Sequence, residues 1–184
     1  MRRKVTVFTP GKQYSGEVDI PNDVLRTTEL FNSTNIYWKD PGGKGFNDSL
    51  LMYNVTLSIT GVREFQKFNK LQVRQPDIIC YNDDLTELSS TEEKTKAEAL
   101  REKASEEQKN VFLITKMRGS SFFMIKGIFY GLFKSKSIKK YIPLSDVVLL
   151  EIIRQQNKWV KNKIPLANNF VGVNTNYIES CTFD

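Results

Sequence analysis

The chain has 184 residues, 40% of them apolar, a net charge of +6 and no histidine. This length fits one ordinary domain or two small ones, and the apolar content excludes wholesale disorder. The absence of histidine removes the commonest general acid–base group and the commonest zinc ligand.

The first third of the chain has the pattern of β-strands. We predict strands at residues 4–9, 14–20, 35–40 and 49–59, where β-branched residues are frequent and polar and apolar residues alternate. A Pro-Gly turn follows the first strand, and glycine-rich residues lie between the third and the fourth. Residues 63–73 fit either a strand or a short helix, because Phe65, Phe68 and Leu71 recur every three residues.

The middle of the chain differs in charge. Residues 76–109 contain 10 acidic and 5 basic residues, whereas residues 1–75 carry +4 and residues 110–184 carry +7. Ser90 and Glu93 fit a helix capping box, and the apolar stripe that follows is thin. We predict an acidic, helix-prone connector, either mobile and partly helical or an ordered helix lying against the rest of the protein.

The last third returns to a β pattern. We predict strands at residues 111–117, 122–134, 141–156 and near 170–178. The two β-rich thirds also resemble each other, with Gly16 matching Gly127 and Asn54 matching Asp146. The predicted fold is therefore mainly β, with two small, strongly bent Sm-like or SH3-like barrels joined by the connector. The domains are residues 1–75, 76–109 and 110–184.

One short stretch carries a family resemblance. "RTTELFN", set between "GEVDIP" and "IYWKD", resembles a group of uncharacterised bacterial Sm-like proteins. The resemblance covers residues 3–59 and, more faintly, 111–152. It implies a small barrel and ring-like assembly. The residues that form the RNA pocket of Sm proteins do not occur here, so the resemblance carries no RNA site onto this chain.

The sequence offers little chemistry for catalysis. Cys80 and Cys181 match no metal-binding spacing, and we interpret them as two reduced thiols, with a disulfide between them as the alternative. The carboxylate cluster at 81–87 lacks the glycine and the final glutamate of a calcium loop. We predict that the protein is not an enzyme and has no metal, cofactor or small-molecule substrate. No apolar run approaches the roughly 20 residues of a membrane span, so we expect a soluble, cytoplasmic protein.

A basic hairpin tip is the candidate anion-binding site. Its residues are Lys134, Lys136, Lys139, Lys140 and Tyr141. Lysines beside aromatic rings are typical of grooves that bind single-stranded nucleic acid. The alternative is a solvated tip whose lysines block strand pairing. Lys158, Lys161 and Lys163 around Trp159 extend the basic patch if they fold nearby.

A second candidate surface is apolar. Within the stretch "SSFFMIKGIFYGLF", the predicted interface residues are Phe122, Phe123, Ile128, Phe129 and Tyr130. The stretch is apolar on both faces, which exceeds what one small barrel buries. It therefore contacts another subunit or lies between the two barrels of one chain. Our leading hypothesis is a non-catalytic assembly or adaptor module that self-associates through strand edges within a larger complex. The rival hypothesis is binding of RNA or single-stranded DNA.

Overall fold

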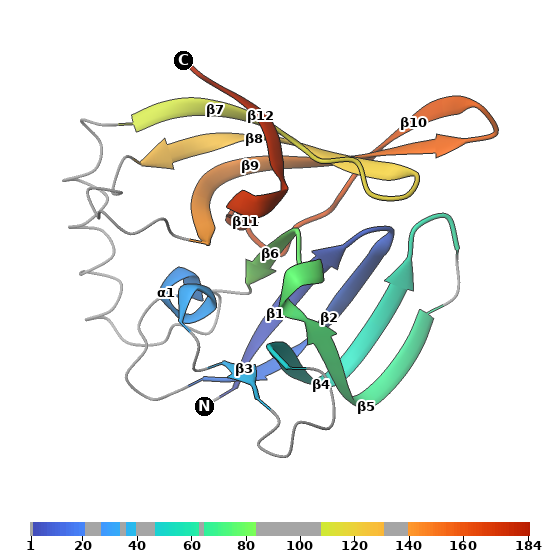
Figure 1. Cartoon of the computed structure of the whole chain (residues 1–184), viewed down its shortest axis with the longest axis vertical. Helices are drawn as coiled ribbons and strands as arrows, with labels where there is room; N and C mark the ends of the chain where they lie inside the picture. The colour runs from blue at the N-terminus through green and yellow to red at the C-terminus, as the bar shows by residue number, and fades with distance from the viewer. Residues whose placement is uncertain are drawn as a thin grey trace.

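The computed structural model describes residues 2–20, 27–33, 36–39, 47–62, 65–83, 108–130 and 140–184 (Figure 1). The elements in chain order are β1 (Arg2–Thr9), β2 (Lys12–Asp19), α1 (Thr27–Asn32), β3 (Tyr37–Trp38), β4 (Ser49–Ile59), β5 (Phe65–Arg74), the 3-10 turn η1 (Gln75–Asp77), β6 (Cys80–Asp83), β7 (Gln108–Thr115), β8 (Ser121–Tyr130), β9 (Tyr141–Gln155), β10 (Lys158–Lys163), β11 (Val171–Asn174), the 3-10 turn η4 (Thr175–Tyr177) and β12 (Ile178–Phe183). The prediction of a mainly β protein is confirmed.

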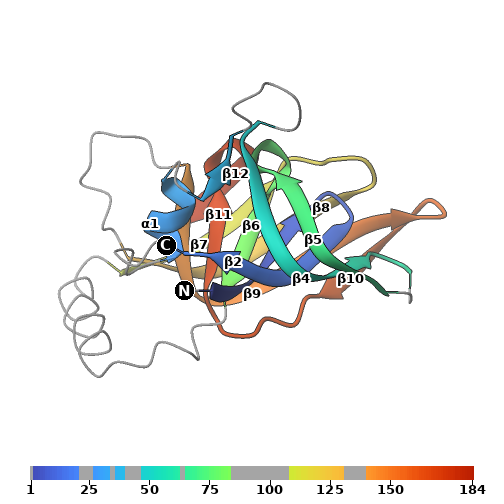
Figure 2. The ribbon, with the colours of Figure 1, turned by 90° about the horizontal axis from the view of Figure 1, so that it is seen from below.

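The described strands form one antiparallel sheet in the order β12-β7-β8-β9-β11-β6-β1-β2-β4-β3, with β10 beside β9 and β5 beside β4. This path has two ends and does not close. β11 pairs with both β9 and β6, and so joins the second half (β7 to β12) to the first (β1 to β6). Figures 1 and 2 show β11 and β6 between the two halves. Because the halves share this junction, their division into two barrels stays a prediction.

The two halves repeat the same pairing scheme. β1-β2-β4-β5 in the first half corresponds to β7-β8-β9-β10 in the second, and β6 and β12 each follow a 3-10 turn and pair with the first strand of their half. The register of the second strand shifts at Gly16 in one half and at Gly127 in the other. A Cβ there would lie 2.7 Å (Gly16) or 3.0 Å (Gly127) from a backbone oxygen of the facing strand. On that facing strand, Asn54 and Asp146 have positive φ angles of 50° and 52°. Both halves therefore bend by the same bulge, as the predicted repeat requires.

Helix α1 arises from the "RTTELFN" stretch and lies at the junction of the halves. Leu30 and Phe31 are fully buried. The side-chain amide of Asn32 donates to the backbone carbonyl of Tyr141 (3.0 Å) and accepts from its backbone N–H (2.9 Å). This amide pairs with the start of β9 as a neighbouring strand would. The stretch that carried the family resemblance therefore has a structural role here.

The core is continuous across the halves. Tyr81 stacks on Phe31 with ring centroids 3.7 Å apart, and its ring also lies close against Gly172 of β11. Phe8 of β1 meets Phe123 of β8 edge-on at 6.1 Å. Because these contacts join residues far apart in the sequence, we expect the halves to unfold together.

Candidate functional site

The side of strands β7 to β10 that points away from the core is unusually apolar. In these strands side chains alternate between buried positions, such as Leu113 and Ile125, and positions on the opposite side of the sheet. The apolar residues on that opposite side are Phe112, Ile114, Phe122, Met124, Val148, Leu150, Ile152 and Trp159. We call this set the outer apolar face. None of its members belongs to either of the two buried core clusters.

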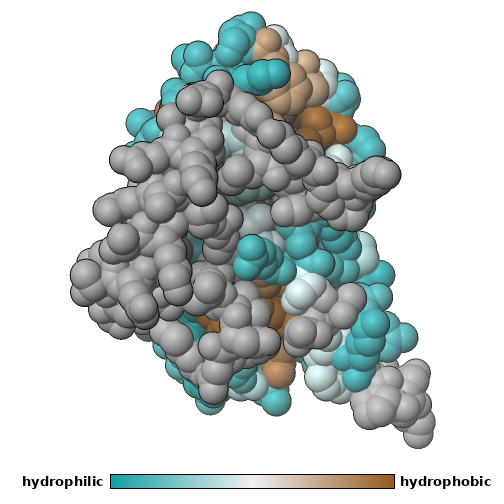
Figure 3. Space-filling view, turned by 90° about the vertical axis from the view of Figure 1, so that its left-hand side faces the viewer, coloured by the Kyte–Doolittle hydropathy of each residue, from teal (hydrophilic) through white to brown (hydrophobic). Residues whose placement is uncertain are grey.

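Cross-strand pairing makes the outer apolar face contiguous. Lys161 of β10 faces Ile152 of β9, which in turn faces Phe122 of β8. The next row runs from Leu150 through Met124 and on to β7. Directly opposed side chains on one face of a sheet touch each other, so the rows form one surface rather than scattered apolar residues. Figure 3 views the end of the molecule opposite the β9–β10 hairpin and shows a patch of brown, apolar surface near the top.

The corresponding side of the first half is polar on β1 and β2 but carries aromatic residues further along. Lys4, Thr6, Ser15 and Thr56 lie on the outer side of β1, β2 and β4. Tyr53 of β4 and Phe65 of β5, which is 66% exposed, lie on the same side. The two halves thus share a backbone scheme and differ in what this side presents to solvent. Most apolar residues on the outer side of the second half are partly exposed, and Ile152 is buried.

Cations border the outer apolar face. Lys126, Arg154, Lys161 and Lys163 are exposed, and their positions in the register place them on the same side as the apolar residues. Of the two acidic residues of β9, Glu151 is buried and Asp146 lies at the bulge. The face therefore combines apolar and aromatic surface with positive charge.

Trp159 is the most exposed aromatic residue of this face. It lies on the β9–β10 hairpin, which extends beyond the other strands in Figures 1 and 2. Gln156 and Asn157 make the turn with φ angles of 45° and 64°, as a tight two-residue hairpin requires. The indole ring is 54% exposed and meets Phe122 edge-on, with centroids 5.7 Å apart. The hairpin thus holds one aromatic ring against another while leaving it open to solvent.

The predicted anion-binding tip lies mostly outside the described residues. Lys134, Lys136 and Lys139 are in that part of the chain. Burial lowers the pKa of the Lys140 side chain. Tyr141 has no exposed surface and packs in the core, so its ring is unavailable for base stacking and that part of the prediction is wrong. Neighbouring residues of a strand point to opposite sides, so a buried tyrosine can directly follow a partly exposed lysine.

The predicted interface residues separate into two groups. Phe122 belongs to the outer apolar face, and Ile128, Phe129 and Tyr130 are half-buried further along β8. Phe123 is 2% exposed and meets Phe8 within the core, so its assignment to a subunit interface is wrong. Phe123 lies instead at the contact between the two halves of one chain, which was the alternative prediction. Sequence reasoning missed Phe112 and Arg154, which only the strand register brings to this surface.

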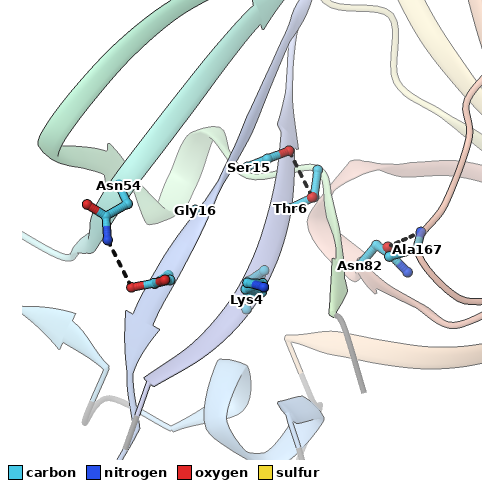
Figure 4. A pocket seen from close by; sticks show the side chains of 9 residues that line it. Lys4, Thr6, Ser15, Gly16, Asn54, Asn82 and Ala167 are labelled. Atoms are coloured by element: carbon cyan, nitrogen blue, oxygen red, sulfur yellow. Dashed lines mark hydrogen bonds between the residues drawn. The ribbon is translucent and has the colours of Figure 1, made fainter. Parts of the chain in front are cut away.

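A pocket of about 260 Å³ opens between strands of the first half and Ala167 of the second, lined by Lys4, Val5, Thr6, Ser15, Gly16, Glu17, Asn54, Asn82 and Ala167 (Figure 4). Several of these groups bond to one another. The Thr6 and Ser15 hydroxyls are 3.0 Å apart, and the Asn54 amide donates to Glu17 at 3.2 Å. This arrangement offers no nucleophile beside a general base.

Buried polar contacts elsewhere hold the fold together. Glu151 is buried between the halves and accepts a hydrogen bond from the Thr60 hydroxyl at 2.9 Å, and burial raises the pKa of its carboxyl group. Arg3 donates to the Thr27 hydroxyl (2.6 Å), which donates to Asp83. No group of three or more metal-ligating side chains gathers among the described residues. No helix in that same part of the chain is long and apolar enough to cross a membrane.

Comparison with known proteins found no matching family model, no matching curated protein and no matching solved structure.

Proposed function

We propose that the protein is a non-catalytic binding module and that its outer apolar face binds single-stranded nucleic acid. The observation that carries this proposal is the combination of three aromatic rings and four cations on one open sheet surface. A single strand supplies flat apolar bases and regularly spaced negative charges. Self-association through this face is less favourable, because it would bring the cations of two copies together.

The spacing of the aromatic rings suits several bases. Trp159 and Phe122 form one stacking point. Phe112 pairs with Lys126 on β8, four residues from Phe122 and one strand away. At about 3.3 Å per residue and about 4.8 Å between strands, the second stacking point lies about 14 Å from the first. Such a separation fits a short site at the lower end of the roughly 4–16 nucleotides that compact sheet domains cover.

The four cations set the expected dependence on salt. Single strands lose about 0.7 logarithmic units of affinity per logarithmic unit of salt for each phosphate neutralised, so four contacts give a slope of about −3. Raising the salt concentration from about 50 to 200 mM should then weaken binding about 50-fold. Stacking contributes about 1–3 kcal/mol per base, so Trp159→Ala should weaken binding by about 5- to 150-fold.

Fluorescence anisotropy with labelled dT12 and rU12 tests the proposal. Lys161→Glu/Lys163→Glu should weaken binding and flatten the salt slope. The matched control is Lys12→Glu/Lys67→Glu on β2 and β5, which makes the same change in net charge on exposed positions of the other half. In Trp38→Phe, the fluorescence of the remaining Trp159 should be quenched by the oligonucleotide. An absence of binding at low salt, or equal weakening in both charge-reversal variants, would contradict the proposal.

In this proposal each half is a small, strongly bent sheet of the Sm-like or SH3-like kind. The shared order of strands and the paired bulges at Gly16 and Gly127 support it. The bend turns the apolar inner sides of both halves toward the core and leaves their outer sides to solvent.

A further inference from the structure

The sheet has edges, and they differ in how well they are protected. Among the described strands, β3, β5, β10 and β12 each pair with a single neighbour. β5 ("FQKFNKLQVR") contains three basic residues and β10 ("KWVKNK") contains three lysines. Such charges are a common means of preventing edge-to-edge pairing. β12 ("IESCTF") contains no lysine, arginine or proline, and all of its residues after Ile178 are exposed.

The hydrogen-bond pattern shows which groups of β12 point away from the sheet. Asp184, just after the strand, exchanges both backbone hydrogen bonds with Asn110 of β7, at 2.9 and 3.0 Å. Residues of an antiparallel strand alternate between facing the partner and facing away. Thr182 therefore faces β7, whereas the backbone N–H and C=O groups of Cys181 and Phe183 point to the open edge.

We propose that two copies of the chain associate by antiparallel pairing of their β12 strands around a two-fold axis at Thr182. In this register Cys181 pairs with Phe183 of the second copy, and Thr182 lies opposite its own counterpart. Asp184 then lies opposite Ser180, so no like charges meet directly. The pairing uses only the regular part of β12 and avoids the irregularity between Ile178 and Ser180.

This pairing would also extend the candidate binding surface. Thr182 is paired with Phe112 of β7, and so lies on the side of the sheet that carries the outer apolar face. A two-fold axis perpendicular to the sheet leaves the outer apolar faces of both copies on the same side. The proposal does not depend on nucleic-acid binding, because the edge of β12 and the face of the sheet are separate surfaces.

Light scattering after size-exclusion chromatography, on nuclease-treated protein from about 5 to 500 µM, tests the pairing. The wild type should reach twice the monomer mass. Thr182→Lys should remain a monomer, because it places two lysines directly opposite each other at the axis. Thr182→Ser is the matched control and should still dimerise. A wild type that stays monomeric at all concentrations would overturn the proposal, as would a dimer that Thr182→Lys leaves intact.

Disulfide trapping supplies a readout that does not rely on the lysine variant. In Thr182→Cys/Cys181→Ser, the two introduced thiols lie opposite each other at about 4.5 Å between Cα atoms, within disulfide range. Mild oxidation should cross-link most of this variant. Native Cys181 lies diagonally from its counterpart, about 7–8 Å away, and should cross-link far less. Cys80 is fully buried and does not interfere. Efficient cross-linking through Cys181 and little through position 182 would refute the proposed register.

Discussion

Gly172→Ala provides the sharpest test of the junction between the halves. Gly172 lies in the middle of β11, the strand that pairs with both β6 and β9. A Cβ at this position would fall on the Cε1 and Cζ atoms of the Tyr81 ring, far closer than atoms in proteins approach each other. Phe31 stacks on the same ring at 3.7 Å, which limits how far the ring can move. The substitution must therefore shift the strand, the stacked rings or both.

The expected loss is large for a single methyl group. Overpacking a well-filled core costs about 1–3 kcal/mol, and the limited movement of the ring places this case at the upper end, about 3 kcal/mol. For a chain of this length, each kcal/mol corresponds to about 2–4 °C, so the melting temperature should fall by about 6–12 °C. Urea unfolding followed by near-ultraviolet circular dichroism measures the loss and reports directly on tyrosine packing.

Two outcomes would refute this reasoning. One is a change in unfolding free energy below about 0.5 kcal/mol, which is the range of ordinary surface substitutions. The other is separate unfolding transitions for the two halves, since a shared strand and core require a single transition. A double-mutant cycle supplies the control. The double variant Gly172→Ala/Tyr81→Leu should lose less unfolding free energy than the sum of the losses of the two single variants, because the smaller side chain at position 81 removes the clash.

Three further predictions concern the buried polar groups. Burial raises the pKa of Glu151 above its unfolded value of 4.5, so the free energy of unfolding should fall as the pH rises from 4.5 through the pKa of the folded state. Glu151→Gln keeps a partner for Thr60 and should lose this pH dependence, measured by urea titrations at several pH values. An unchanged pH profile would show that Glu151 is not the titrating group. Asn32→Ala leaves the backbone groups of Tyr141 without their partner and should cost about 1–3 kcal/mol, whereas an isosteric Asn32→Asp that costs nothing would contradict the pairing. Burial raises the pKa of the Cys80 thiol, so Ellman's reagent should titrate one cysteine in the native protein and two in urea, and two fast thiols would contradict the fold.

The strands were predictable where the hydrophobic pattern is local. The predicted strand at 49–59 coincides with β4, and the predicted strand at 141–156 differs from β9 by one residue at its end. Residues 63–73, for which strand and helix were both open, largely belong to β5. The repeat was also readable, because Gly16 and Gly127 occupy corresponding positions at which a Cβ would crowd the facing backbone.

Other features were hidden because they depend on contacts distant in the sequence. β6 falls inside residues 76–109, the segment predicted as an acidic connector. The four buried residues of β6 are few compared with the many charged residues of the 76–109 segment, so the segment as a whole was predicted to be a connector. Helix α1 has six residues, too few to show a helical period. Tyr141 seemed to belong with the neighbouring lysines, but the alternation of side chains along β9 turns it into the core.

The difference between the two halves is the strongest argument for locating a binding role in the second. Both halves keep the glycine bulge, the same pairing order and the strand after a 3-10 turn, which are the features that determine the backbone. On the outer side, the first half has polar residues such as Thr6 and Ser15 and a single strongly exposed aromatic residue, Phe65, while the second has Phe122 and Met124 in adjacent rows. A sheet needs only one apolar side to fold, and a second exposed apolar side favours aggregation unless a partner covers it. The outer apolar face is therefore the surface on which we propose a binding role.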